Sequence, residues 1–115
     1  MSARPDSAYL ADIQEAIRRI VGYTARMSYE QFHNDDRTQD AVMRNLEIIG
    51  EATKNISTSF RKRHSGIPWK QMAALRDRLI HHYFGVNLDI VWNVITEELT
   101  EVAGRIEIAR KDYLF

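Results

Sequence analysis

The sequence predicts an all-α protein, an antiparallel up-and-down four-helix bundle with a possible short extra helix, built as a single domain over residues 1–115. Apolar residues recur at intervals of three and four in four long segments, which is typical of the buried face of an amphipathic helix. No segment alternates apolar and polar residues as a half-buried strand does. A chain of 115 residues with 44% hydrophobic and 28% charged residues fits one globular core.

The N-terminal half contains two of the long helices. Asp6 or Ser7 is available as the N-cap of the first. A short turn of helix is expected at residues 29–33, and Asp35 or Asp36 can cap the second long helix. The expected buried faces are Leu10, Ile13, Ile17, Ile20, Val21, Thr24 and Met27 in the first helix, and Val42, Leu46, Ile49, Ala52, Thr53 and Ile56 in the second.

The C-terminal half contains the other two helices. Pro68 suits the first turn of the third helix, because a missing N–H costs nothing there. This helix is expected to run to about Tyr83, with Gly85 placed to end it, and Asn87 can cap the fourth helix. The stripe of the fourth helix is Leu88, Val91, Trp92, Ile95, Leu99, Val102, Ile106 and Ala109.

The most basic stretch of the chain is Arg61-Lys62-Arg63, in a helix end and loop over residues 57–66. A solvated loop is the favoured interpretation, because short basic clusters are common and no aromatic residues interleave with this one to stack on bases. A phosphate-binding patch is the alternative.

Composition limits the possible functions. Sixteen basic and sixteen acidic residues give no formal net charge, so any contact with nucleic acid must be local. The absence of cysteine excludes disulfides, thiolate metal sites and cysteine nucleophiles. No apolar run approaches the ~20 residues that span a bilayer, and no signal-peptide pattern occurs, so a cytoplasmic protein without a membrane partner is expected.

Several apolar residues lie behind the main stripes, which is more than one bundle core needs. They indicate that a second copy covers part of the surface. A homodimer is therefore expected from Ile48, Ile90, Val94 and Ile108.

Arg76 is the unusual residue of the third helix. With ~100° per residue on a regular helix, five apolar or aromatic side chains fall within ~60° of it. An unpaired charge in the middle of an apolar face would cost several kcal/mol, unless partners such as Asn45, Thr53 or Glu98, or a water-lined cleft, accommodate it. The five neighbours on the wheel are Trp69, Met72, Leu79, Ile80 and Tyr83.

Asp77 and His81 are neighbours at i and i+4 on the opposite flank, where a carboxylate can hold the tautomer of an imidazole. Arg76 and His81 lie ~140° apart on a regular helix, so one copy does not aim both at a single atom. Convergence requires a wrapping arginine, a loosened helix before Gly85, or a second subunit across a two-fold axis.

Arg76, His81 and Tyr83 form an Arg-x4-His-x-Tyr pattern. With the flanking segments 67–70 and 83–86 and the segment 44–52 of the second helix, the chain resembles the HepT-like toxins of the HEPN superfamily. The similarity extends over almost the whole chain. It implies a single HEPN-like helical domain.

The resemblance implies a toxin that is a metal-independent RNA endonuclease without cofactor or metal, acting as a homodimer with a composite active site. His81 would act as general base or acid, Arg76 would stabilise charge on the phosphorus, and Asp77 would orient His81. Many members carry asparagine at the position of Asp77. Adjacent histidines diverge by ~100° on a helix, which disfavours a metal site at His81 and His82.

The resemblance also implies a partner, a minimal nucleotidyltransferase of the MntA type that acts as antitoxin by adenylylating Tyr83. Geometry alone would make Tyr83 a packing residue, since it lies on the face of Arg76. The alternative function is a non-catalytic nucleotide- or substrate-binding subunit that docks a nucleotidyltransferase. Such a subunit has no need of Arg76 and His81 together.

Overall fold

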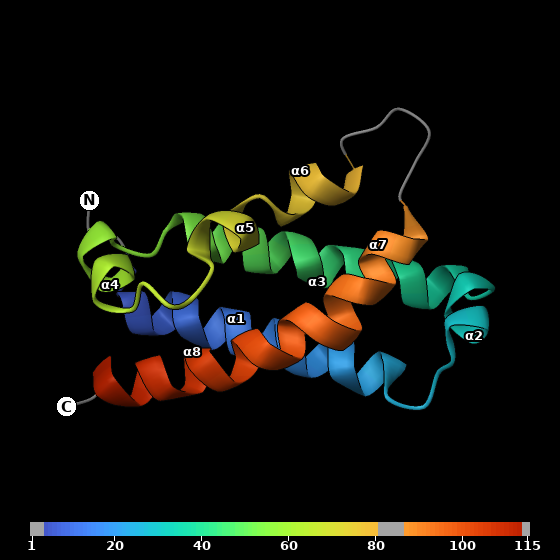
Figure 1. Cartoon of the computed structure of the whole chain (residues 1–115), viewed down its shortest axis with the longest axis horizontal. Coiled ribbons are helices and arrows are strands. Elements are labelled where there is room, and N and C mark those ends of the chain that lie inside the picture. The colour runs from blue at the N-terminus through green and yellow to red at the C-terminus, as the bar shows by residue number, and fades with distance from the viewer. Residues whose placement is uncertain (1–3, 81–86, 114–115) are drawn as a thin grey trace.

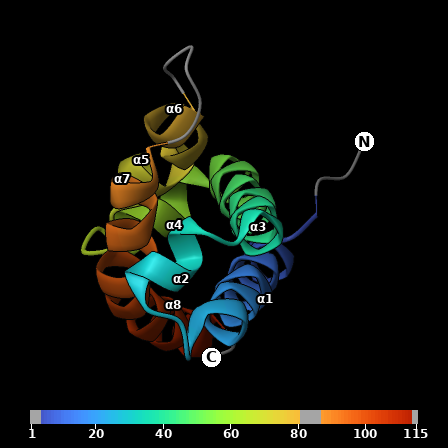
Figure 2. The same ribbon diagram turned by 90° about the vertical axis from the view of Figure 1, so that its right-hand side faces the viewer.

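The computed structural model describes residues 4–80 and 87–113, and within these ranges the chain is helical with no strand. Figure 1 shows that the long elements run alternately in opposite directions, and Figure 2 shows them surrounding a common interior. The predicted all-α fold is confirmed. The elements are α1 (Asp6–Thr24), α2 (Tyr29–His33), α3 (Asp36–Lys54), α4 (Thr58–Arg63), α5 (Trp69–Ala73), α6 (Leu75–Ile80), α7 (Leu88–Asn93), η1 (Val94–Glu98) and α8 (Leu99–Tyr113).

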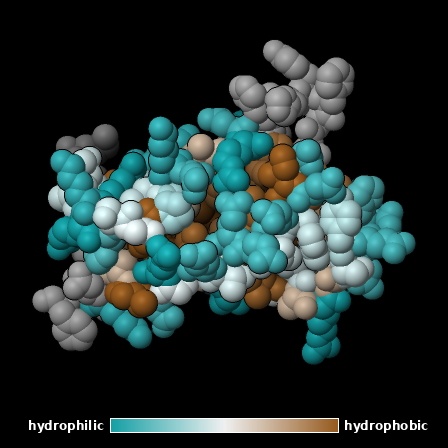
Figure 3. Space-filling view, in the orientation of Figure 1, coloured by the Kyte–Doolittle hydropathy of each residue, from teal (hydrophilic) through white to brown (hydrophobic). Residues whose placement is uncertain are grey.

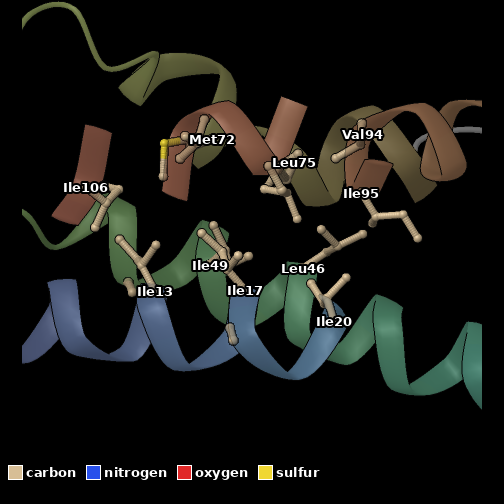
Figure 4. Close-up of a cluster of buried hydrophobic side chains, with 14 of the residues drawn as sticks. Ile13, Ile17, Ile20, Leu46, Ile49, Met72, Leu75, Val94, Ile95 and Ile106 are labelled. Carbon is tan, nitrogen blue, oxygen red and sulfur yellow. The ribbon is translucent and has the colours of Figure 1, made fainter. Parts of the chain in front are cut away.

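The hydrophobic core lies between α1 and α3 on one side and the α5–α6 and η1–α8 segments on the other. α1 packs against α3 and α8, and α3 packs against α5 and α6. Figure 4 shows isoleucines of α1 pointing toward apolar side chains from α3, from the α5–α6 segment and from the η1–α8 segment. The labelled core residues are Ile13, Ile17, Ile20, Leu46, Ile49, Met72, Leu75, Val94, Ile95 and Ile106, all at most 4% exposed.

The helix caps are partly as predicted. Asp35 is the N-cap of α3 and accepts a hydrogen bond from the N–H of Thr38 at 3.0 Å, and Asn87 caps α7. The cap of α1 differs, because Pro5 holds that position without a side-chain bond. Asp6 instead accepts from the N–H and the hydroxyl of Ser57, at 2.8 and 2.6 Å. It therefore ties the start of α1 to the α3–α4 connection.

The basic stretch is not a loop. Residues 58–63 form the short helix α4, whose N-cap Ser57 accepts from the N–H of Phe60, and Phe60 is fully buried. The Arg61-Lys62-Arg63 triad is the last turn of this helix, where positive charge is favourable. The anchoring phenylalanine explains why this polar segment is ordered as a helix.

The predicted third helix is two helices. α5 ends at Ala73, Ala74 has φ −91° and ψ 5°, and α6 begins at Leu75. No proline or glycine marks this break, so the periodicity of the sequence did not reveal it.

The predicted fourth helix contains a π-helical turn, η1, in which the N–H of Leu99 bonds to the carbonyl of Val94. The wider turn lets Val94 and Ile95 both be buried. Val94 was predicted to be surplus apolar surface, and this prediction is wrong. Ile90 and Ile108 are exposed as predicted.

Two smaller corrections concern the faces of α1 and α3. Val21, predicted in the stripe of the first helix, is 45% exposed, whereas Ile48, predicted as surplus, packs against the core. None of the described helices is long and apolar enough to cross a membrane.

Candidate functional site

The site predicted from the sequence begins on α6, a helix of six residues at the edge of the bundle (Figure 1). Leu75 and Leu79, each 2% exposed, hold α6 against α3. Arg76 is exposed. The prediction that Arg76 lies in the middle of the apolar face is wrong, because the buried edge of α6 contains Leu75 and Leu79 whereas Arg76 is exposed.

The partners considered for a buried Arg76 are engaged elsewhere. The amide of Asn45 donates to the carbonyl of Ala41 at 2.9 Å, and the hydroxyl of Thr53 donates to the carbonyl of Ile49 at 2.7 Å. Both bonds lie within α3. Within residues 4–80 and 87–113, no hydrogen bond or ion pair to Arg76 is present.

Asp77 follows Arg76 and is also exposed. A cation and a carboxylate are therefore exposed at consecutive positions of one short helix. His81 and Tyr83 lie outside the described residues, as does the predicted helix end at Gly85. The predicted pairing of Asp77 with His81 and the distance between Arg76 and His81 therefore stay predictions.

Arg78, also on α6, forms an ion pair that the sequence pattern does not indicate. Its guanidinium donates two parallel hydrogen bonds to Glu98, each 3.2 Å long. The two side chains are 33% and 36% exposed. This ion pair joins α6 to η1 across 20 residues of sequence, so no local sequence pattern predicts it.

A groove lies beside this ion pair, between α5–α6 and η1–α8, with a volume of about 260 Å³. Its rim carries two pairs of opposite charge, Arg78 with Glu98 and Arg105 with Glu101. Figure 3 shows hydrophobic surface on this face only as separate areas among hydrophilic side chains. The rim charges cancel, so this groove has no preference for an anion. Its apolar lining is Met72, Leu75, Val94, Leu99 and Val102.

Comparisons with known proteins bear on the motif. A 46% identical relative from Thermococcus cleftensis, named "Probable ribonuclease HepT", aligns over 94% of this chain and 98% of its own length. A candidate RNase of Methanocaldococcus jannaschii is 44% identical over 91% of this chain and 87% of its own. Another, from Caldanaerobacter subterraneus, is 42% identical over 90% and 94%. No solved structure matches the chain.

The sequence model described as "Ribonuclease HepT-like" matches residues 13–108, which include the exposed Arg76 and Asp77 and the whole Arg-x4-His-x-Tyr pattern. The predicted resemblance and the predicted enzyme class, ribonuclease, are thereby confirmed at the level of the family. The chain belongs to the ribonuclease HepT-like family.

Proposed function

We propose that this protein is the toxin of a toxin–antitoxin pair, and that it cleaves RNA without a metal ion. The observation that carries the proposal is the exposed Arg76, which has no anionic partner within the described ranges and begins the family motif. A structural arginine would be neutralised by the fold, as Arg78 is by Glu98. An exposed arginine beside Asp77 suits a phosphate better.

The chemistry is an attack of the ribose 2′-oxygen on the adjacent phosphorus. His81 takes the proton of the 2′-hydroxyl, the bond from phosphorus to the 5′-oxygen breaks, and that oxygen leaves with a proton from an acid. Arg76 stabilises the charge that develops on the phosphoryl oxygens, and Asp77 orients His81. The products are a 2′,3′-cyclic phosphate end and a free 5′-hydroxyl end.

A homodimer completes the site. Arg76 and His81 diverge by ~140° on a regular helix, so two facing copies of the motif supply what one copy lacks. α6 stands at the edge of the bundle in Figure 1, where a second copy has access to Arg76 and Asp77. Two copies of His81 can then divide the roles of base and acid.

The antitoxin of this pair is a minimal nucleotidyltransferase that adenylylates Tyr83. The added phosphate and nucleoside would compete with RNA for Arg76, because both present anions to the same guanidinium. Incubation of the two proteins with ATP, followed by intact-mass measurement, tests this step. The expected result is added mass on the wild type and none on Tyr83→Phe; added mass on both would contradict it.

The ribonuclease proposal is tested by incubating purified protein with single-stranded RNA in the presence of EDTA. Wild type is expected to produce cyclic-phosphate ends, and His81→Ala is expected to produce none. Growth arrest on expression should follow the same division. A wild type that binds the nucleotidyltransferase but leaves RNA intact would support the docking subunit instead, and a fully active His81→Ala would exclude the mechanism.

A further inference from the structure

A second hollow lies on the other flank of α5, where the end of α3, α4 and α5 meet. It has a volume of about 1060 Å³ and reaches Asp77 on α6. Of its lining residues, only Asp77 has a role in the mechanism above. We call it the lysine groove after its cationic lining residues, which are Lys54, Arg61, Lys62 and Lys70.

The charge of the lysine groove is concentrated there by the fold. The whole chain has four lysines, and three of them line this hollow. Four cations against the single carboxylate of Asp77 give the lining a net charge of +3. The groove beside Arg78 instead carries two arginines and two glutamates, which cancel. A protein with no formal net charge thus has a strongly cationic lysine groove beside a neutral groove at Arg78.

These cations are available to an external anion. Lys62 and Lys70 are exposed and form no ion pair with another residue of the described ranges. Lys54 lies 3.9 Å from Glu51 in an exposed pair, which holds it only weakly. The guanidinium of Arg61, a residue of α4, donates to the carbonyl of Thr53 at 2.6 Å, and this bond holds it beside the end of α3.

The groove is suited to a phosphate backbone rather than to bases. Trp69, the one large aromatic residue of its lining, is only 6% exposed, so no ring is offered for stacking. Cationic side chains along a groove bind single-stranded nucleic acid through its phosphates and with little dependence on sequence.

We propose that the lysine groove binds the phosphate backbone of a single RNA strand and leads it to the start of α6. The groove runs from Lys62 on α4 past Lys70 on α5 to Asp77, the neighbour of Arg76. A strand that follows it therefore reaches Asp77, one position along α6 from Arg76, the residue that contacts the scissile phosphate under the proposed function. The direction toward cleavage rests on the proposed function, whereas binding in the groove does not.

The test compares two triple variants that each remove three positive charges. One is Lys54→Gln, Lys62→Gln, Lys70→Gln. The matched control is Arg26→Gln, Arg37→Gln, Lys111→Gln; Arg26 and Arg37 are exposed beside α2, at the opposite end of the bundle from α4 (Figure 1).

The probe is a fluorescent single-stranded 2′-O-methyl RNA of about 16 nucleotides, which cannot be cleaved through its 2′-oxygen. Its affinity is measured against salt concentration. Three lost phosphate contacts should make the log–log slope shallower by about 2, because each contact to a single strand contributes about 0.7. If the two proteins have the same RNA affinity at 1 M salt, this change of slope makes binding by the groove triple about 100-fold weaker than that of the wild type at 0.1 M salt. The control triple should keep the slope of the wild type.

Equal losses in both triples would show that only overall charge matters and would overturn the proposal. Unchanged binding by the groove triple, or no binding by the wild type, would overturn it as well. Should the groove triple unfold, Lys70→Glu on its own must still make the slope shallower. Cleavage of unmodified RNA by the wild type is measured separately. If the protein cuts RNA but binds it outside the lysine groove, only the groove proposal is refuted. If it binds RNA in the groove but does not cut it, only the ribonuclease proposal is refuted.

Discussion

Two arginines on α6 offer a matched comparison. Arg76 and Arg78 are two positions apart, and replacing either by alanine removes the same charge from the same short helix. Their surroundings differ, because Arg78 is bound to Glu98 while Arg76 is exposed to solvent. We therefore expect opposite effects of the two replacements on stability and on cleavage.

The stability effect is estimated from the contacts. Exposed ion pairs contribute about 0.2–1 kcal/mol, and two parallel hydrogen bonds from one guanidinium favour the upper half of that range. Arg78→Ala should therefore lower the free energy of unfolding by about 0.5–1 kcal/mol. In a double-mutant cycle with Glu98→Ala, most of that loss should appear as coupling energy. Arg76→Ala should change the free energy of unfolding by less than about 0.5 kcal/mol.

The effect on cleavage should be reversed. A donor that stabilises transition-state charge contributes about 10²–10³-fold to the rate, so Arg76→Ala should lower kcat by that factor. Arg78→Ala should leave kcat within a few-fold of wild type, since its side chain is turned to Glu98. Urea unfolding and cleavage of a fluorescent RNA measure the two quantities on the same proteins.

Two outcomes would refute this reasoning. A loss of more than about 2 kcal/mol in Arg76→Ala would mean that the arginine is buried in a paired state after all. A normal kcat in Arg76→Ala together with a low kcat in Arg78→Ala would show that Arg78, and not Arg76, supplies the catalytic charge.

Three further predictions concern the scaffold. Gly50→Ala should raise the free energy of unfolding by about 0.5–1 kcal/mol in a urea titration, because alanine favours the helix and its Cβ would meet two α5 carbonyl oxygens at 3.5 Å, an ordinary contact distance. Gly50→Leu should lower the free energy of unfolding by about 1–3 kcal/mol, because the larger side chain would overpack the same space. Ile49→Ala should cost about 2–5 kcal/mol in the same assay, since Ile49 is 0% exposed. Hydrogen bonds from Thr38 lower the pKa of Asp35, so its contribution is present above the ordinary carboxyl pKa and is lost as the pH falls through its folded pKa. The stability difference between wild type and Asp35→Asn should therefore shrink between pH 7 and pH 3; a constant difference in urea midpoint would contradict this.

Local chemistry made the caps of α3 and α7 and the short helix α2 predictable, but not the cap of α1. Asp35 and Asn87 cap their helices because a side-chain oxygen placed before an apolar stripe can reach a free N–H, and that relation is contained in a few residues. The helix α4 was harder to predict, since a single apolar residue, the fully buried Phe60, fixes it to the core and no apolar periodicity marks it. Periodicity of the apolar residues predicts one continuous helix, so it could not reveal the break at Ala74.

The error about Arg76 changes the argument for its role. A buried arginine needs partners to offset its desolvation, and those partners would compete with a phosphate for the same donors. An exposed arginine has neither the cost nor the competition, but water screens its charge and weakens its pull on a transition state. Excluding that water requires a cover over α6, and a second copy facing it would provide one. With a second copy as that cover, as proposed above, cleavage would depend on dimerisation, and activity should then fall faster than binding as the protein is diluted below its dimer dissociation constant.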